Sequence, residues 1–132
     1  MRNVFLSYAD SDVRCARNLA KILKKRGLRV WMDDVDVPSA GNWGYEVGDA
    51  LRKSDAMVVL LSPNAVNSRS VMHDIEYAIM EERFEHRLIP VVLKRTRDIP
   101  GVLEYQEPIL ATGERRRSAF QEVARRLLKK AG

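Results

Sequence analysis

Ala56-Met57-Val58-Val59-Leu60-Leu61 is an unbroken apolar run, and it indicates the class of fold. A strand with one face in water alternates apolar and polar residues, whereas a strand covered on both faces of a parallel sheet is apolar throughout. The run is followed by Ser62-Pro63-Asn64, which is turn chemistry. The stretch therefore predicts a central strand of a sheet that helices cover on both sides.

On either side of this run, the chain alternates similar strand-like segments with segments whose apolar residues recur at helical spacing. The remaining predicted strands are Val4–Tyr8, Arg29–Met32, Leu88–Leu93 and Pro108–Leu110. The predicted helices cover residues 13–23, 43–51, 70–83 and 115–130. Asp10-Ser11-Asp12 is suited to capping the first helix, and Gly27 is suited to ending it. Pro90 lacks a backbone donor, which predicts an edge position or a local break in its strand.

This alternation predicts an α/β fold with five parallel strands and helices on both faces of the sheet. Right-handed crossovers favour the strand order 2-1-3-4-5, which is a flavodoxin-like three-layer sandwich. No internal repeat, low-complexity segment or linker interrupts the pattern, so we expect one domain over residues 1–132.

The predicted fold also places a candidate site. In such sheets, ligands bind outside the carboxyl ends of the strands, at the point where the strand order reverses. Three segments meet there: Ser7-Tyr8-Ala9 after the first strand, Asp33-Asp34 after the second and Ser62-Pro63-Asn64 after the third.

Specific residues argue against three common functions of this fold class. A phosphoacceptor receiver domain needs an aspartate where the chain carries Leu60-Leu61-Ser62. A flavodoxin would bind the FMN phosphate in the first loop, where Asp10 and Asp12 would repel it. A nucleotide-binding glycine loop of the Walker or GxGxxG type is absent from the sequence.

The composition indicates the cellular location of the protein and argues against several kinds of ligand. One cysteine and two histidines favour neither an internal disulfide nor a metal site. No apolar run approaches the roughly 20 residues of a membrane span, and no leader precedes the first strand, so we expect a cytoplasmic protein. The net charge is +5, with basic residues gathered near the end of the chain. Glu114 and Glu122 interrupt them, which favours a solvated helix face over nucleic-acid binding.

Taken in order, these motifs resemble the TIR (Toll/interleukin-1 receptor) domain family, in its bacterial form. The resemblance covers nearly the whole chain, and it is the order and spacing of the motifs that carry it. The matching segments are Val4–Ala9, Gly27–Asp33, Ser39–Trp43, Ser54–Pro63, Asp74–Ile79 and Arg87–Val91. Ser39–Trp43 resembles part of the loop that the family calls the BB loop.

The resemblance implies a reaction. Many TIR domains cleave the nicotinamide–ribose bond of NAD⁺, so NAD⁺ would be the substrate and no separate cofactor is expected. Nicotinamide is already a cationic leaving group, so the reaction needs a carboxylate beside the developing oxocarbenium ion rather than a general acid. In the family this carboxylate is a glutamate early in the third helix, usually four residues after a tryptophan.

The chain departs from the family at both of these positions. The alignment places Asp74 at the glutamate and Ser70 at the tryptophan. Aspartate retracts the charge by one methylene, and misplacement on that scale can lower a rate about a hundredfold. Two roles for Asp74 therefore stay open: the catalytic carboxylate, or a charge favourable to the start of the helix dipole.

The resemblance also implies substrate-binding residues around the same end of the sheet. They are Tyr8, Ala9, Asp33, Ser39, Gly41, Trp43 and Ser70. Several have a plainer interpretation: Tyr8 as core packing, Asp33 as the end of a strand, and Trp43 as an anchor at the start of a helix.

The resemblance also implies binding partners. In TIR domains the BB loop, here residues 33–42, docks onto a neighbouring copy, and a fused or separate sensor controls assembly. Two functions stay open, and nucleic-acid binding by the basic C-terminal helix is a third and weaker one. One is an NAD⁺-cleaving enzyme in a bacterial defence or cell-death response, favoured by the bacterial character of the sequence and the retained carboxylate. The other is a scaffold that assembles without turnover, favoured by Asp74 and Ser70.

Overall fold

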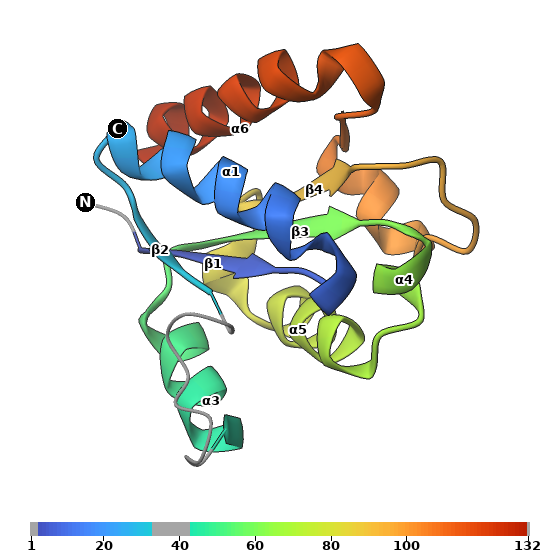
Figure 1. The fold of residues 1–132 in the computed structure, drawn as a ribbon. Coiled ribbons are helices and arrows are strands. Elements are labelled where there is room, and N and C mark those ends of the chain that lie inside the picture. Colours follow the sequence, from blue (N-terminus) through green and yellow to red (C-terminus); the bar gives the residue numbers. More distant parts are fainter. Residues whose placement is uncertain (1–2, 33–42, 132) are drawn as a thin grey trace.

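The structure is a computed structural model that describes residues 3–32 and 43–131. Within these residues, five parallel strands form one sheet in the order β2-β1-β3-β4-β5 (Figure 1). The strands are β1 (Asn3–Ser7), β2 (Arg29–Trp31), β3 (Ala56–Leu61), β4 (Leu88–Val92) and β5 (Ile109–Leu110). Each lies within one residue of its predicted position, and the predicted fold class is confirmed.

Helices cover both faces of the sheet. α1 and α6 pack on one face, and α3 and α5 pack on the other (Figure 1). The helices are α1 (Val13–Lys25), α3 (Trp43–Lys53), α4 (Pro63–Val66), α5 (Arg69–Met80) and α6 (Arg116–Ala131). Short 3₁₀ turns are η1 (Asp10–Asp12), η2 (Glu82–Phe84), η3 (Gly101–Gln106) and η4 (Gly113–Arg115).

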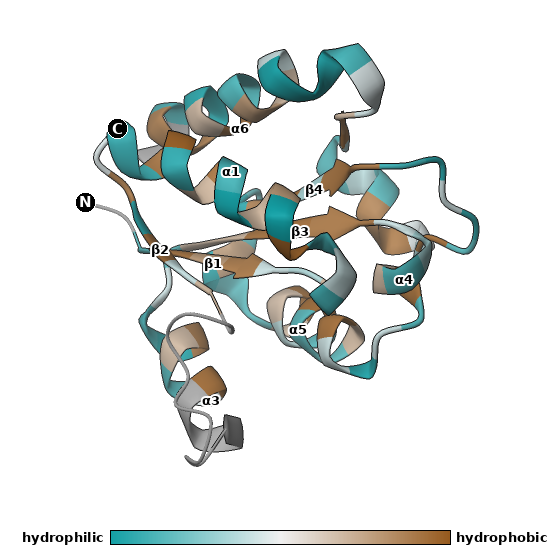
Figure 2. Cartoon of the chain, in the orientation of Figure 1, coloured by the Kyte–Doolittle hydropathy of each residue, from teal (hydrophilic) through white to brown (hydrophobic). Residues whose placement is uncertain are grey.

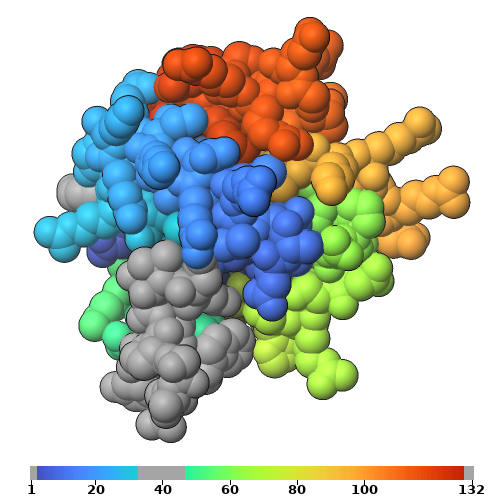
Figure 3. Space-filling view, in the orientation of Figure 1, coloured from blue at the N-terminus to red at the C-terminus, as the bar shows by residue number. Residues whose placement is uncertain are grey.

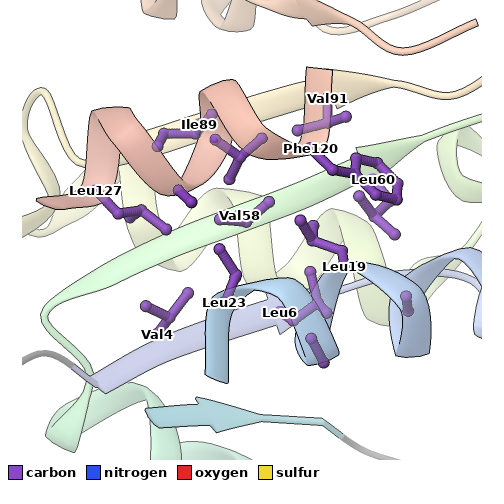
Figure 4. Close-up of a cluster of buried hydrophobic side chains, with 14 of the residues drawn as sticks. Val4, Leu6, Leu19, Leu23, Val58, Leu60, Ile89, Val91, Phe120 and Leu127 are labelled. Atoms are coloured by element: carbon purple, nitrogen blue, oxygen red, sulfur yellow. The ribbon is translucent and has the colours of Figure 1, made fainter. Parts of the chain in front are cut away.

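The alternation of side chains along each strand divides the interior into two cores. On one face, residues of β1, β3 and β4 meet α1 and α6 in what we call the α1/α6 core. Figure 4 labels ten of its members: Val4, Leu6, Leu19, Leu23, Val58, Leu60, Ile89, Val91, Phe120 and Leu127. The intervening strand residues, among them Phe5, Met57 and Val59, face α3 and α5 and form the α5 core. β3 is buried throughout because it contributes to both.

Pro90 does not lie at an edge, and the sequence prediction was wrong on this point. It sits within β4, between β3 and β5, opposite Val59. Leu93 donates its backbone N–H to β3, so by alternation the backbone N–H position of residue 90 faces β5. β5 pairs only with Val91 and Val92, so the missing donor has no partner to lose.

Two helix ends explain how the elements are bounded. Gly27 has φ +88°, a left-handed conformation that glycine adopts readily, and Leu28 donates back to the carbonyl of Leu23 at 3.2 Å. Gly27 therefore ends the first helical segment as predicted. The helix predicted over residues 70–83 instead ends at Met80, because Glu81 is extended and η2 begins after it.

Candidate functional site

Asp74 lies at the carboxyl ends of the strands, inside the protein. Its side chain is 4 % exposed, and its Oδ2 accepts a hydrogen bond from Ser7 Oγ at 2.8 Å. Ser7 is the last residue of β1, so the two side chains join the end of a central strand to α5. The first turn of α5 contains no acidic residue, so a charge at the start of the helix does not describe Asp74.

The local sequence explains this geometry. Phe5 packs in the α5 core and Leu6 in the α1/α6 core, so Ser7 points toward α5 by the alternation of the strand. α5 begins where Ser68 Oγ accepts a hydrogen bond from the backbone N–H of Val71 at 3.2 Å. This cap fixes the phase of the helix, which turns Asp74 inward.

Ser70 lies one helical turn before Asp74 on α5 and is half-buried. Residues four apart share a face of a helix, so the structure brings these two predicted site residues together. A serine at this place supplies a hydroxyl group and little surface. An aromatic side chain there would provide a flat apolar wall, which the serine lacks.

The two predicted residues after β1 face different ways. Both are 7 % exposed, but Tyr8 packs in the α1/α6 core, whereas Ala9 packs in the α5 core. Ala9 is therefore on the side of the sheet that carries Asp74, and Tyr8 is on the other. A contact between Tyr8 and substrate stays a prediction.

The remaining predicted site residues lie at the edge of what the structure covers. Asp33, Ser39 and Gly41, with the whole loop 33–42, fall outside the described residues. Trp43 is the first residue of α3, as predicted, and its side chain is outside the described part.

A second buried pair was missed by the sequence analysis. Ser62 Oγ donates to Asp12 Oδ2, and these side chains are 1 % and 5 % exposed. Nearby, Asn64 Nδ2 donates to Ser11 Oγ at 2.7 Å. The loops after β1 and β3 are thus tied to each other across the point where the strand order reverses.

This arrangement corrects the role predicted for Asp10-Ser11-Asp12. The segment forms η1, and Asp12 precedes α1 without a capping hydrogen bond from its side chain. Its carboxylate is directed to Ser62 instead. Ser62 also caps α4, since its Oγ accepts from the backbone N–H of Ala65 at 3.1 Å, so the predicted turn is a short helix. The sequence analysis placed the segments after β1 and β3 at the same edge of the sheet, because both follow the carboxyl ends of strands. It could not predict that their side chains form a hydrogen bond.

A surface groove of about 380 Å³ lies away from Asp74. Asn3, Arg29 and Lys53 contribute to its lining, which places it at the amino ends of β1 and β2. The Lys53 side chain holds the pKa of Asp49, another lining residue, below its ordinary value. We do not place the active site here because ligands of this fold class bind at the opposite ends of the strands.

Within residues 3–32 and 43–131, no cluster of three or more histidine, cysteine, aspartate or glutamate side chains is arranged to hold a metal ion. Over the same part of the chain, none of the helices combines the length and the apolar character that crossing a bilayer requires.

A family model described as "TIR domain" matches residues 4–128. A curated relative, the "Probable 2' cyclic ADP-D-ribose synthase TcpO" of Methanobrevibacter olleyae, is 19 % identical over 129 residues. The match covers 97 % of this chain and 38 % of the relative, so the chain spans well under half the length of that protein.

Three solved structures share the fold. The TIR domain of the Toll-related receptor TRR-2 from Hydra magnipapillata has a TM-score of 0.76 at 18 % identity, covering 98 % of each chain. The TIR domains of the activated Roq1 resistosome have a TM-score of 0.61 at 22 % identity, covering 98 % of this chain and 75 % of that one. A CMP N-glycosidase, BcmB of Clostridium botulinum, has a TM-score of 0.64 at 15 % identity, covering 92 % and 97 %.

Proposed function

The chain belongs to the TIR domain family, and from that membership we propose that it cleaves NAD⁺ at the nicotinamide–ribose bond, with Asp74 as the carboxylate beside the ribose. NAD⁺ is the substrate, and no further cofactor takes part. The observation that carries the proposal is the position of Asp74: a buried carboxylate, oriented by Ser7, at the end of a central strand.

The reaction needs few groups from the protein. The bond between the ribose C1′ and the nicotinamide nitrogen breaks, and its electron pair neutralises the pyridinium ring. Positive charge develops on the ribose, where a nearby carboxylate in a site poor in water stabilises it. Water, or a hydroxyl group of the ADP-ribose itself, then adds to C1′ and releases a proton. Hydrolysis and cyclisation differ only in this second step.

The names of two similar proteins support chemistry at the ribose. The curated relative is called a probable 2' cyclic ADP-D-ribose synthase, and one structural neighbour is an N-glycosidase of CMP. An N-glycosidase cleaves the bond between a base and a sugar. Ligands of this fold class bind at the carboxyl ends of the strands. Asp74 lies at these ends, where it would be close to such a bond.

The burial of Asp74 connects the reaction to assembly. With 4 % of the side chain exposed, a ribose can reach the carboxylate only after neighbouring groups move. We propose that loop 33–42 docks onto a second copy and that this contact favours the open arrangement. An isolated domain would then be weakly active because its competent state is rarely populated. The setting that fits is a cytoplasmic bacterial defence or cell-death response, triggered by a fused or separate sensor.

A scaffold without turnover is the second candidate, and specific residues favour it. Asp74 is shorter than the family's glutamate, and Ser70 gives no aromatic wall one turn earlier on α5. A domain that had lost its chemistry would retain assembly and show these two changes. The two functions therefore differ in turnover alone.

The test is NAD⁺ consumption by concentrated protein, followed by chromatography of the products. We expect slow turnover in the wild type, loss of turnover in Asp74→Ala, and a gain of about tenfold or more in Asp74→Glu, because glutamate carries the charge closer to the ribose. Ser70→Trp in the Asp74→Glu background should raise turnover further.

Each result selects one function. A silent wild type that Asp74→Glu with Ser70→Trp restores would mean that this chain is a scaffold derived from an enzyme. Turnover that survives Asp74→Ala unchanged would assign the reaction to another group and end the proposal.

A further inference from the structure

The charges of this chain are divided between two regions. Residues 13–26 and 113–131, which form α1, α6 and their flanks, hold 13 of the 23 basic residues and two of the 18 acidic ones. The rest of the chain therefore carries 10 basic and 16 acidic residues. A net charge of +5 conceals one strongly cationic region and one anionic remainder.

The cationic region is a continuous face of the molecule. α1 and α6 lie side by side on one face of the sheet, joined by a hydrogen bond from Arg26 to Gln121, and they adjoin on the surface (Figures 1 and 3). Hydrophilic residues run along both helices (Figure 2). We call this surface the α1/α6 face. Its exposed basic residues are Arg14, Arg17, Lys21, Lys24, Lys25, Arg26, Arg115, Arg117, Arg125 and Lys129.

Two other arginines of α6 are directed to backbone groups. Arg116 donates to the carbonyls of Ala111 and Leu93, at 3.0 and 2.7 Å, and so ties α6 to the ends of β4 and β5. Arg126 pairs with Glu107 at 3.1 Å. The ten exposed residues above are therefore the ones that a partner would meet.

The opposite side of the sheet carries a surface of the other sign. The end of α5 and the turn after it present four glutamates: Glu76, Glu81, Glu82 and Glu85. We call these residues, with Ile79 and Met80, the α5 patch. Ile79 and Met80 are 43 % and 83 % exposed, so apolar side chains lie beside these carboxylates.

One basic residue within this segment, Arg83, does not reduce the negative charge on its surface. Arg83 points inward, where it donates to the carbonyl of Leu51 and to the hydroxyl of Tyr77 and lies 4.8 Å from the centre of the Phe84 ring. Arg87 is the exposed arginine that follows the patch in sequence. The surface formed by residues 76–87 is therefore acidic and partly apolar.

We propose that the α1/α6 face of one copy binds the α5 patch of the next. The charges are complementary, and the long stems of lysine and arginine can cover Ile79 and Met80. Pairing of two α1/α6 faces is opposed by repulsion between like charges. A lipid surface fits less well. Of the large exposed apolar residues among those described, Leu110 shares a groove with Arg115 and Arg125, and a single side chain offers little apolar surface to insert.

The arrangement of the two surfaces fixes the kind of assembly. They lie on opposite faces of one sheet, so the contact is head-to-tail and leaves a free surface at each end of a growing row. Such a row extends as an open filament unless the rotation between copies closes it into a ring. The contact uses neither loop 33–42 nor Asp74, so it adds a second surface to the assembly proposed above and depends on none of its catalytic steps.

The experiment reverses charge on each surface in turn. One variant combines Lys21→Glu with Arg125→Glu on the α1/α6 face, and the other combines Glu82→Lys with Glu85→Lys on the α5 patch. Lys94→Glu with Arg95→Glu is a matched control, because both residues are exposed outside these surfaces and the change in net charge equals that of the first variant. Sedimentation velocity without NAD⁺ gives the size of the species, and thermal melts confirm that each variant folds.

We expect the wild type and the control to associate in about 0.05 M salt and to dissociate in about 0.5 M salt, where screening shortens the electrostatic range. Each variant alone should associate at least tenfold more weakly. An equal mixture of the two variants should form a heterodimer and no longer row, because the intact α5 patch of the first variant fits the intact α1/α6 face of the second. A wild type that stays monomeric in low salt, or a mixture that forms no heterodimer, overturns the proposal. In the first case, salt-sensitive binding of a labelled DNA duplex by the monomer would assign the α1/α6 face to nucleic acid.

Discussion

The hydroxyl of Ser7 and the carboxylate of Asp74 form the smallest unit on which the proposed chemistry rests. A carboxylate removed from water is costly unless groups within the protein donate to it. Ser7 Oγ does so at 2.8 Å, and it also fixes where the carboxylate points. Orientation matters because an electrostatic group stabilises a transition state only where charge develops.

Replacing Ser7 by alanine removes that donor and leaves the charge in place. We expect Ser7→Ala to lower NAD⁺ turnover by about tenfold to a hundredfold, since a carboxylate displaced by about 1 Å loses that much. Ser7→Thr keeps a hydroxyl group and should retain more activity. The measurement is the turnover number of each variant at one assembly state. Ser118→Ala, which removes an exposed hydroxyl on α6, serves as the control.

Sequence reasoning reached Asp74 but not its partner. The family resemblance placed Asp74 by its position before Ile75-Glu76-Tyr77-Ala78. Ser7 is 67 residues earlier, and no local pattern shows that the two side chains meet. The same reason hid the pair formed by Asp12 and Ser62, which lie 50 residues apart. Long-range polar pairs depend on which rotamers the packed core allows, and periodicity does not carry that information.

Arg83 is the clearest link between elements around the site. From η2 it reaches the carbonyl of Leu51 near the end of α3, and the hydroxyl of Tyr77 on α5 at 3.2 Å. Its guanidinium also lies over the rings of Tyr77 and Phe84. α3, which follows loop 33–42, is thereby fastened to the helix that carries Asp74.

Arg83→Met should lower the free energy of unfolding by about 1–3 kcal/mol, because a half-buried carbonyl loses its charged donor. Arg83→Lys should restore little, since an ammonium group cannot keep the planar stacking on both rings. Urea denaturation measures the change. Arg87→Met is the matched control because Arg87 is exposed, and its effect should stay within about 0.5 kcal/mol. Equal losses in the two methionine variants would contradict the role given to Arg83.

At this scale the sequence predicts the regular elements well and their exceptions poorly. Apolar runs such as Ala56–Leu61 place strands within one residue, because burial on both faces leaves few alternatives. The end of α5 at Met80 and the interior position of Pro90 were not predicted. Both depend on neighbours: the first on the extended Glu81, the second on β5 being too short to need the donor.

The whole molecule has a cationic region, formed by α1, α6 and their flanks, and an anionic remainder. Contacts between these regions of neighbouring copies should affect activity. If contacts between copies open the way to Asp74, turnover per molecule should rise with protein concentration and fall in high salt. We expect at least a tenfold rise across the concentration range in which sedimentation shows assembly. Activity that is strictly proportional to protein concentration throughout that range would separate catalysis from assembly.

The central claim is that Asp74 supports cleavage of NAD⁺, and release of nicotinamide tests it most directly. The measurement compares wild type with Asp74→Asn, matched for assembly state by light scattering. Asparagine keeps the size of the side chain and an acceptor for Ser7 but removes the charge. The account predicts slow release by the wild type and release about 10²–10³-fold slower by Asp74→Asn, the usual effect of losing one electrostatic stabiliser. Equal release by both proteins, or no release by the assembled wild type, would contradict it.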